Sequence, residues 1–267
     1  MLAAPGTSGR FEGDALHSIF AAGPIVALLL AAAPPPAPGP VPSSPAAPST
    51  PAPAPLPVPA LVDRVVDAYG GKAALERWPV VVQEGEVAAH TGADVGRLTR
   101  IFERPRRLRV TIGYPGGRGE QRILDGDLGW RDGREVTGTP AQAAMILQAA
   151  RMELPLSLLA ARDRLADEGV VDRDGKPLRA LTLPLGNGLT MTAEIDESTG
   201  RILRTVGRMP GGVGSLEFVT TYGDFRKVAG TWVPFREENH VQGRHSGTTE
   251  IRTAEFLVEA PTGAFRP

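Results

Sequence analysis

The chain has 267 residues, of which 42% are hydrophobic and 22% are charged, and its formal net charge is −1. This balance supplies no broad positive field, so we expect no nucleic-acid partner. The absence of cysteine excludes a disulfide framework, a thiolate zinc site, a thiol nucleophile and a lipidated cysteine.

Near the start of the chain, residues 19–33 form an apolar run of 15 residues that ends in Ala31, Ala32 and Ala33. The run is shorter than the ~20 residues that span a bilayer comfortably, and its small terminal residues suit a signal peptidase. Because Pro34 blocks cleavage directly after Ala33, the cut is expected after Ala31 or Ala32. We therefore expect export, with residues 1–33 as a signal peptide or, alternatively, as an uncleaved N-terminal anchor.

The following stretch, residues 34–59, holds 13 of the 26 prolines and no charged residue. Proline fixes φ and lacks an amide donor, so this stretch is expected to run as polyproline II and to reach ~80 Å. One interpretation is a linker that tethers the next domain across a gap. The other is a disordered remnant of processing.

Residues 60–267 are expected to form one domain. Its first helix is predicted over residues 61–69, where apolar side chains recur at helical spacing before a stop signal at Gly70 and Gly71. A short turn follows over residues 73–78.

A central helical region is predicted after Thr139 and Pro140, which are typical of an N-cap followed by the first helical residue. The apolar stripe of this region runs over residues 141–154 and resumes over residues 156–165, after Pro155.

The remaining segments alternate with a period of two, which predicts strands joined by tight turns. Short hairpins are expected over residues 80–136. Further strands are expected over residues 178–185, 189–196, 202–208, 216–225, 232–241 and 248–258. Ten or eleven consecutive antiparallel strands, with helices only at the start and in the middle, predict an α+β domain with a single large curved antiparallel sheet.

Two of these strands separate apolar from polar side chains clearly. Leu189 and Met191 share one face of their strand, as do Leu108, Val110 and Ile112. The apolar face is aliphatic and contains methionine, which suits an adaptable lining for acyl chains. A dry core under the helices explains the same pattern, and periodicity alone does not separate the two interpretations.

Several motifs resemble the LolA family and its lipoprotein-sorting relatives, including LolB-like and RseB-like proteins. Residues 101–110 (IFERPRRLRV) are followed by an Asp125-Gly126 turn and by Trp130, in the order found in that family. The first helix ends in Tyr69-Gly70-Gly71, as in the larger relatives, and residues 222–225 are similar as well. The resemblance covers roughly residues 61–265.

The resemblance implies a periplasmic, unclosed antiparallel barrel with a helical lid over an apolar hollow that takes acyl chains. Arg104 matches the family arginine that holds the lid closed, and Leu108 and Val110 match lining positions. The residues expected to line the hollow are Phe102, Leu108, Val110, Ile112, Trp130, Met145, Leu189 and Met191.

The function predicted in this way is a periplasmic carrier that holds an acyl chain, a lipid or a lipoprotein. The alternative is an envelope-stress sensor or interaction module on the same scaffold. We expect a monomer, with a membrane or an envelope protein as a further partner, and no cofactor.

An enzyme is the competing class, and a metal-dependent hydrolase is its remote form. The histidines of the domain are His90, His240 and His245, and the last two are expected on opposite faces of one strand unless Gly243 turns the chain. No serine lies in a G-x-S-x-G motif. We therefore expect neither an enzyme nor a metal site.

Two groups of charged residues receive structural interpretations. Glu194 and Asp196 are expected on a solvent-exposed face of their strand. Six arginines cluster in the sequence and are expected to form a solvated outer face, with contact to anionic lipid headgroups as the alternative. They are Arg97, Arg100, Arg104, Arg106, Arg107 and Arg109.

Overall fold

The computed structural model describes residues 55–90, 94–212 and 214–267. The predicted signal peptide or anchor and all but the last residues of the proline-rich stretch lie outside the described residues. The helices are α1 (Val58–Ala68), α2 (Lys72–Arg77), α3 (Pro140–Met152) and α4 (Leu154–Ala160), with 3-10 turns at Pro115–Gly117 and Arg162–Arg164. Helix α1 thus begins within the expected linker, with Pro59 in its first turn, where proline is tolerated.

Thirteen strands form one antiparallel sheet, in the order β6-β5-β4-β3-β2-β1-β13-β12-β11-β10-β9-β8-β7. The strands are β1 (Val80–Ala89), β2 (Val95–Glu103), β3 (Arg107–Gly113), β4 (Gly119–Asp125), β5 (Leu128–Arg131), β6 (Arg134–Glu135), β7 (Ala166–Arg173), β8 (Lys176–Gly186), β9 (Leu189–Asp196), β10 (Arg201–Pro210), β11 (Ser215–Val228), β12 (Thr231–Val241) and β13 (Arg244–Leu257).

The strand order shows how the sheet stays unclosed. The first and last strands, β1 and β13, pair at its centre, while β6 and β7 stand at its two edges. The expected α+β class with one large curved antiparallel sheet is confirmed, with more strands than expected. One strand that periodicity missed is β7, an edge strand whose side chains are mostly exposed and therefore lack an apolar alternation.

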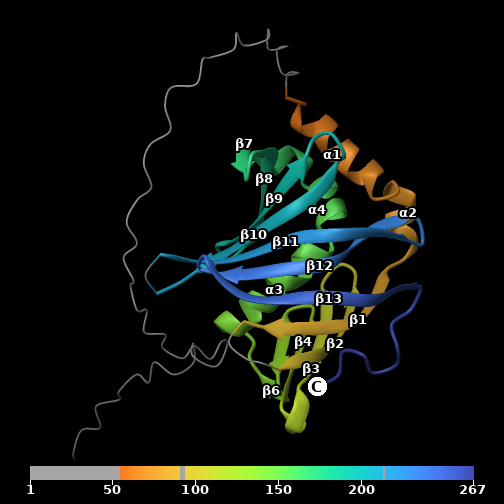
Figure 1. Cartoon of the computed structure of the whole chain (residues 1–267), viewed down its shortest axis with the longest axis vertical. Coiled ribbons are helices and arrows are strands. Elements are labelled where there is room, and N and C mark those ends of the chain that lie inside the picture. The colour runs from red at the N-terminus through yellow and green to blue at the C-terminus, as the bar shows by residue number, and fades with distance from the viewer. Residues whose placement is uncertain (1–54, 91–93, 213) are drawn as a thin grey trace, which may run out of the picture. The chain divides into compact units, whose positions relative to one another are not determined.

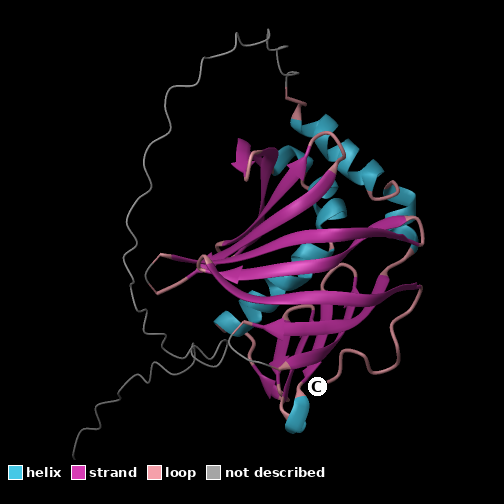
Figure 2. Ribbon diagram, in the orientation of Figure 1, coloured by secondary structure: helices cyan, strands magenta, loops and turns pink. Residues whose placement is uncertain are grey.

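Helices α3 and α4, called the lid below, carry the chain from edge strand β6 to edge strand β7. Helix α3 lies across the sheet and contacts β3, β4 and β5 on one side and β9 and β10 on the other (Figures 1 and 2). Its start is as predicted, because the Thr139 side chain accepts a hydrogen bond from the backbone N–H of Gln142 and Pro140 follows directly. Within the described ranges, no single helix is long and apolar enough to span a membrane, and α3 with α4, bent by 85°, passes that test only as a pair.

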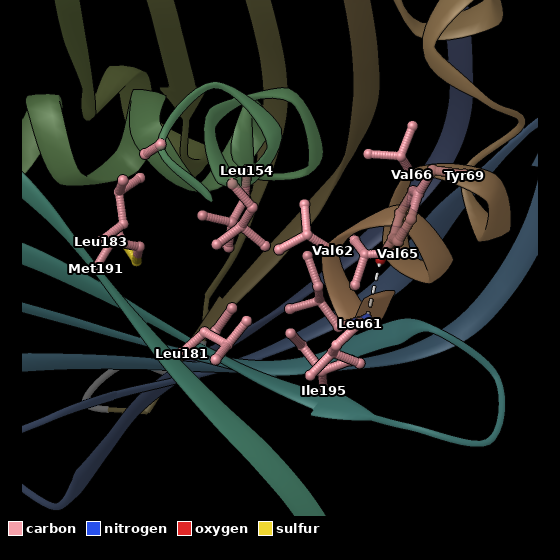
Figure 3. Close-up of a cluster of buried hydrophobic side chains, with 14 of the residues drawn as sticks. Leu61, Val62, Val65, Val66, Tyr69, Leu154, Leu181, Leu183, Met191 and Ile195 are labelled. Carbon is pink, nitrogen blue, oxygen red and sulfur yellow. Dashed lines mark hydrogen bonds between the residues drawn. The ribbon is translucent and has the colours of Figure 1, made fainter. Parts of the chain in front are cut away.

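The face of the sheet that carries the lid is closely packed. Leu61, Val62 and Val65 of α1 are fully buried, and they meet Leu154 of α4 and Ile195 of β9 (Figure 3). A second cluster, beneath α3, is built mainly from β2, β3 and β12. These clusters fix the helices against the concave face.

The opposite face is covered in part by the end of the chain. Ile123 of β4 packs there with Ala264 and Phe265, and Ile101 and Trp130 join them. Adjacent residues of a strand point to opposite faces, so Ile123 lies outside while its neighbour Leu124 belongs to the cluster beneath α3.

A bulge bends the central strand pair. The register between β1 and β13 shifts at Glu84 and Gly85. A Cβ atom at Gly85 would lie 2.1 Å from the carbonyl oxygen of Glu250, so only glycine fits this close approach.

Candidate functional site

A cavity of about 90 Å³ lies between the lid and the sheet. Most of its wall is apolar and comes from the end of α1, from α2, from the lid and from β1, β10, β12 and β13. The apolar lining residues are Tyr69, Leu75, Val81, Met152, Leu154, Pro155, Ile202, Trp232, Val233, Pro234 and Phe256. The polar ones are Gln83, Arg104, Arg151, Thr205, Tyr222, Thr231 and Glu237.

Arg104 joins the lid to the rest of the domain. Its Nε lies 2.6 Å from Oε2 of Glu153, the residue between α3 and α4. Its Nη1 donates a hydrogen bond to the backbone carbonyl of Trp78, which follows α2. Burial raises the pKa of Glu153 to about 7, although the Arg104 charge opposes that rise. Above about pH 7 the contact is therefore an ion pair, and below that pH a neutral Glu153 carboxyl group faces the charged guanidinium of Arg104.

A buried group of charges forms the polar end of the cavity. Arg100 of β2 donates to both carboxylate oxygens of Glu237, at 2.9 Å and 3.0 Å, and Arg151 of α3 donates to the same carboxylate at 3.1 Å. Burial alone would raise the pKa of Glu237, but Arg100 and Arg151 together outweigh it and lower that pKa to about 2. Glu237 is therefore ionised at neutral pH, and two guanidinium groups share one carboxylate.

Further polar side chains line the cavity beside this group of charges. The Tyr222 hydroxyl lies 3.0 Å from the Thr205 hydroxyl, and burial raises the pKa of Tyr222. Gln83 pairs directly with Arg100 across β1 and β2 and is 3% exposed. Its Oε1 is buried and has no hydrogen-bond partner among the described residues. A buried polar atom without a hydrogen-bond partner is rare in native proteins, so its presence here needs an explanation.

Of the nine residues expected at the site, Arg104 is the one that lines this cavity. Five of the others, Phe102, Leu108, Val110, Ile112 and Met145, pack together beneath α3.

The last three are divided between two clusters. Leu189 and Met191 belong to the cluster that α1 and α4 cover. Trp130 packs with Ile123 and Phe265 on the opposite face. The structure thus brings most of the expected residues together as dry core, and their role as ligand contacts stays a prediction.

Comparisons with known proteins place this geometry in a fold family. No family model and no curated protein matches the chain. Among solved structures, a LolA superfamily protein from Nitrosomonas europaea has 14% sequence identity and a TM-score of 0.51, and the match covers 77% of this chain and 96% of that one. The chain has a LolA-like fold. A domain described as an outer membrane lipoprotein-sorting protein, from Vibrio parahaemolyticus, matches this LolA-like chain at 13% identity and a TM-score of 0.50, over 79% of this chain and 97% of the other.

Sequence reasoning about this LolA-like chain did not predict that Arg100, Arg151 and Glu237 line or adjoin the cavity, and it expected Arg100 on a solvated outer face, whereas Arg100 is 2% exposed. A signal was present, because Leu98, Arg100 and Phe102 alternate along β2 and are all buried. A charged residue at the apolar positions of a strand indicates a buried ion pair or a site.

The histidines are brought closer than their spacing predicted. The turn at Gly243 places His240 opposite His245 across β12 and β13, with ring centroids 5.1 Å apart. His90 Nδ1 lies 3.3 Å from His245 Nδ1. Within the described residues, however, no three potential metal-ligating side chains are arranged to hold a metal ion.

Proposed function

We propose that this LolA-like chain is an exported carrier that holds an acyl chain of a lipid or lipoprotein in the cavity beneath its lid. The observation that carries the proposal is a mostly apolar cavity under two helices, which Arg104 joins to the rest of the domain through Glu153. Support for a periplasmic location comes from the apolar run at residues 19–33 and from the fold shared with a lipoprotein-sorting domain.

The size of the cavity limits what the closed form holds. A buried water needs about 10–15 Å³ of such space, so a cavity of about 90 Å³ takes roughly six to nine water-sized groups. Burying about six CH₂ groups at ~0.8 kcal/mol each contributes about 5 kcal/mol before ordering costs. A longer chain needs more room, which only a shift of the lid supplies.

The packed cluster beneath α3 is the natural extension of the cavity. Met145 and Met152 lie on the inner side of α3, and methionine adapts to changes of shape at low cost. We propose that lid movement exposes Phe102, Leu108 and Val110 to a long acyl chain, so that these residues bind ligand only in the open form.

The test uses a cavity-filling substitution and a matched control. Val81 lines the cavity and is 7% exposed, so Val81→Trp fills the space that the acyl chain needs. Val170 on β7 is 55% exposed, so Val170→Trp adds the same side chain outside the cavity. Uptake of a fluorescent fatty-acyl probe is expected to fall at least about tenfold for Val81→Trp and to stay unchanged for Val170→Trp.

Native mass spectrometry of the purified protein gives a second reading. A lipid retained by the parent protein and lost in Val81→Trp supports the carrier. Equal probe binding by the parent and by Val81→Trp, with both folded by circular dichroism, contradicts the proposal.

A further inference from the structure

The charged groups at the polar end of the cavity carry more positive than negative charge. Arg100 and Arg151 carry two positive charges, and both contact the single carboxylate of Glu237. The Nε atoms of both arginines are buried and have no hydrogen-bond partner within the described part of the chain. A buried guanidinium normally has its charge balanced and its donors used, so this group has room for one more negative charge.

The surrounding charges do not remove this excess. Arg122 of β4 also lies near the group and pairs with Glu120 at 2.9 Å. Burial is the main cause of its lowered pKa; the Glu120 charge opposes this shift, and the positive charges of Arg131, Arg151 and Arg100 add to it. Arg122 therefore does not supply the negative charge that Arg100 and Arg151 lack.

Gln83 supplies the second, independent observation. It lines the cavity, is buried, and has an unpartnered Oε1. Rotation of its amide presents either oxygen or NH₂ at the same place. Gln83 and Arg151 thus both line the cavity, and each has a buried polar atom without a hydrogen-bond partner among the described residues.

We propose that the cavity binds a single-chain carboxylic acid head first, with the carboxylate at Arg151 and Gln83 and the tail along the apolar wall of Val81, Leu154 and Phe256. This inference rests on the proposed function, because it assumes that the cavity takes an acyl chain, and it narrows the ligand to a free fatty acid, since an acyl chain attached to a lipoprotein has no free carboxylate. It adds a selection among ligands: a free acid is preferred over esters, alcohols and amines of equal length.

A carboxylate is the head group that fits best. Its one negative charge brings the total of Arg100, Arg151 and Glu237 to zero, whereas a phosphate monoester would overshoot. Its two oxygens accept from the Nε of Arg151 and from the Gln83 amide at once, and hydrogen bonds to charged groups are stronger than neutral ones. Covalently bonded atoms lie closer together than separate water molecules do. A chain of eight carbons, as in octanoate, is therefore close to the size that a cavity of about 90 Å³ accepts.

The experiment compares four eight-carbon probes on the full chain at neutral pH by isothermal titration calorimetry: octanoate, methyl octanoate, octan-1-ol and octylamine. Octanoate is expected to bind at least about tenfold more tightly than the ester and the alcohol, and octylamine is expected to bind least. Equal affinity for octanoate and its ester overturns this inference and leaves the carrier intact. Binding of none of the four contradicts both.

Substitutions then test the position of the head group. Gln83→Glu places a negative charge beside the carboxylate and is expected to weaken octanoate at least about tenfold while methyl octanoate changes less than twofold. Gln121→Glu on β4 is the matched control, because Gln121 is not among the lining residues. If Gln83→Glu does not fold, Gln83→Leu is used instead and is expected to reduce the preference of the parent for acid over ester. An unchanged octanoate affinity in a folded Gln83 variant overturns the inference.

Discussion

Replacing Glu237 by glutamine tests the energetic weight of the buried charge group. The substitution keeps the shape of the side chain and removes its charge, so Arg100 and Arg151 remain buried without a counter-charge. The pKa of Glu237 falls from an ordinary 4.5 to about 2, and at 1.36 kcal/mol per pKa unit this corresponds to about 3 kcal/mol. Breaking a buried ion pair by removing one partner costs a similar ~3–5 kcal/mol.

The assay is thermal and urea unfolding of Glu237→Gln at neutral pH. For a domain of this size, a loss of about 3 kcal/mol lowers Tm by roughly 6–12 °C. Glu238→Gln is the control, since Glu238 pairs with Arg236 at the surface, with 44% of its side chain exposed, and such pairs contribute at most ~1 kcal/mol.

The pH dependence gives a second reading of the same substitution. Because the pKa of Glu237 is depressed in the folded state, its contribution is present above about pH 4.5 and is lost as the pH falls toward 2. The parent should lose this share of stability over that range, and Glu237→Gln should lack it. A Glu237→Gln protein whose free energy of unfolding lies within about 1 kcal/mol of the parent at neutral pH would refute the reasoning.

Three further predictions concern the lid and the sheet. Burial raises the pKa of Glu153 to about 7, so the contribution of its neutral form to stability is present below about pH 4.5 and is lost as the pH rises through 7. Glu153→Gln should therefore flatten the plot of Tm against pH over this window. A slope equal to that of the parent would contradict this prediction. Arg104→Leu removes the contacts with Glu153 and Trp78 and should raise the rate of acyl-probe uptake severalfold in stopped-flow fluorescence, whereas a rate equal to that of the parent would mean that Arg104 does not hold the lid. Gly85→Ala forces a Cβ atom against the backbone of β13 and should lower the free energy of unfolding by about 3 kcal/mol. The control is Gly113→Ala, whose new Cβ atom meets nothing within 4 Å and which should cost less than ~1 kcal/mol. Equal effects of the two substitutions in urea titrations would contradict the argument that the bulge requires glycine.

Much of the architecture could be predicted from the period of the apolar residues. Leu189 and Met191 are buried on β9, and Leu108, Val110 and Ile112 are buried on β3, as their alternation indicates. The same rule fails where strands are short or exposed at an edge. Such strands bury too little surface to require an apolar face, so β7 carries almost no such signal.

Charge was a poor guide to exposure. Glu194 and Asp196 were expected in solvent, but they are 2% and 8% exposed. Arg173 and Arg204 cover Glu194, at 2.6 Å and 2.5 Å, and Lys176 covers Asp196 at 2.9 Å. Partners distant along the chain bury these carboxylates, and no local pattern shows them.

The cluster of arginines was divided by the sheet. Arg109 donates to the backbone of Ala264 in the segment that covers the outer face, whereas Arg100 is 2% exposed and pairs with Glu237. Strand parity separates such residues once the register is known. The cavity could not be predicted in this way, because its place depends on how closely Tyr69, Leu75 and Leu154 approach strands that lie far away in the sequence.

The way in which α3 and α4 connect the two edge strands restricts how the proposed carrier could admit a ligand. The pair is anchored at both ends, since the chain enters it from β6 and leaves it toward β7. A lid attached on one side can swing outward, but a lid attached on two sides has to bend. The 85° bend between α3 and α4, beside Glu153, is where this lid is already bent. For the proposed carrier, we therefore expect ligand entry to depend on the distance between the two edges of the sheet: a larger distance between β6 and β7 would stretch α3 and α4, and a smaller one would let them bow away from the sheet.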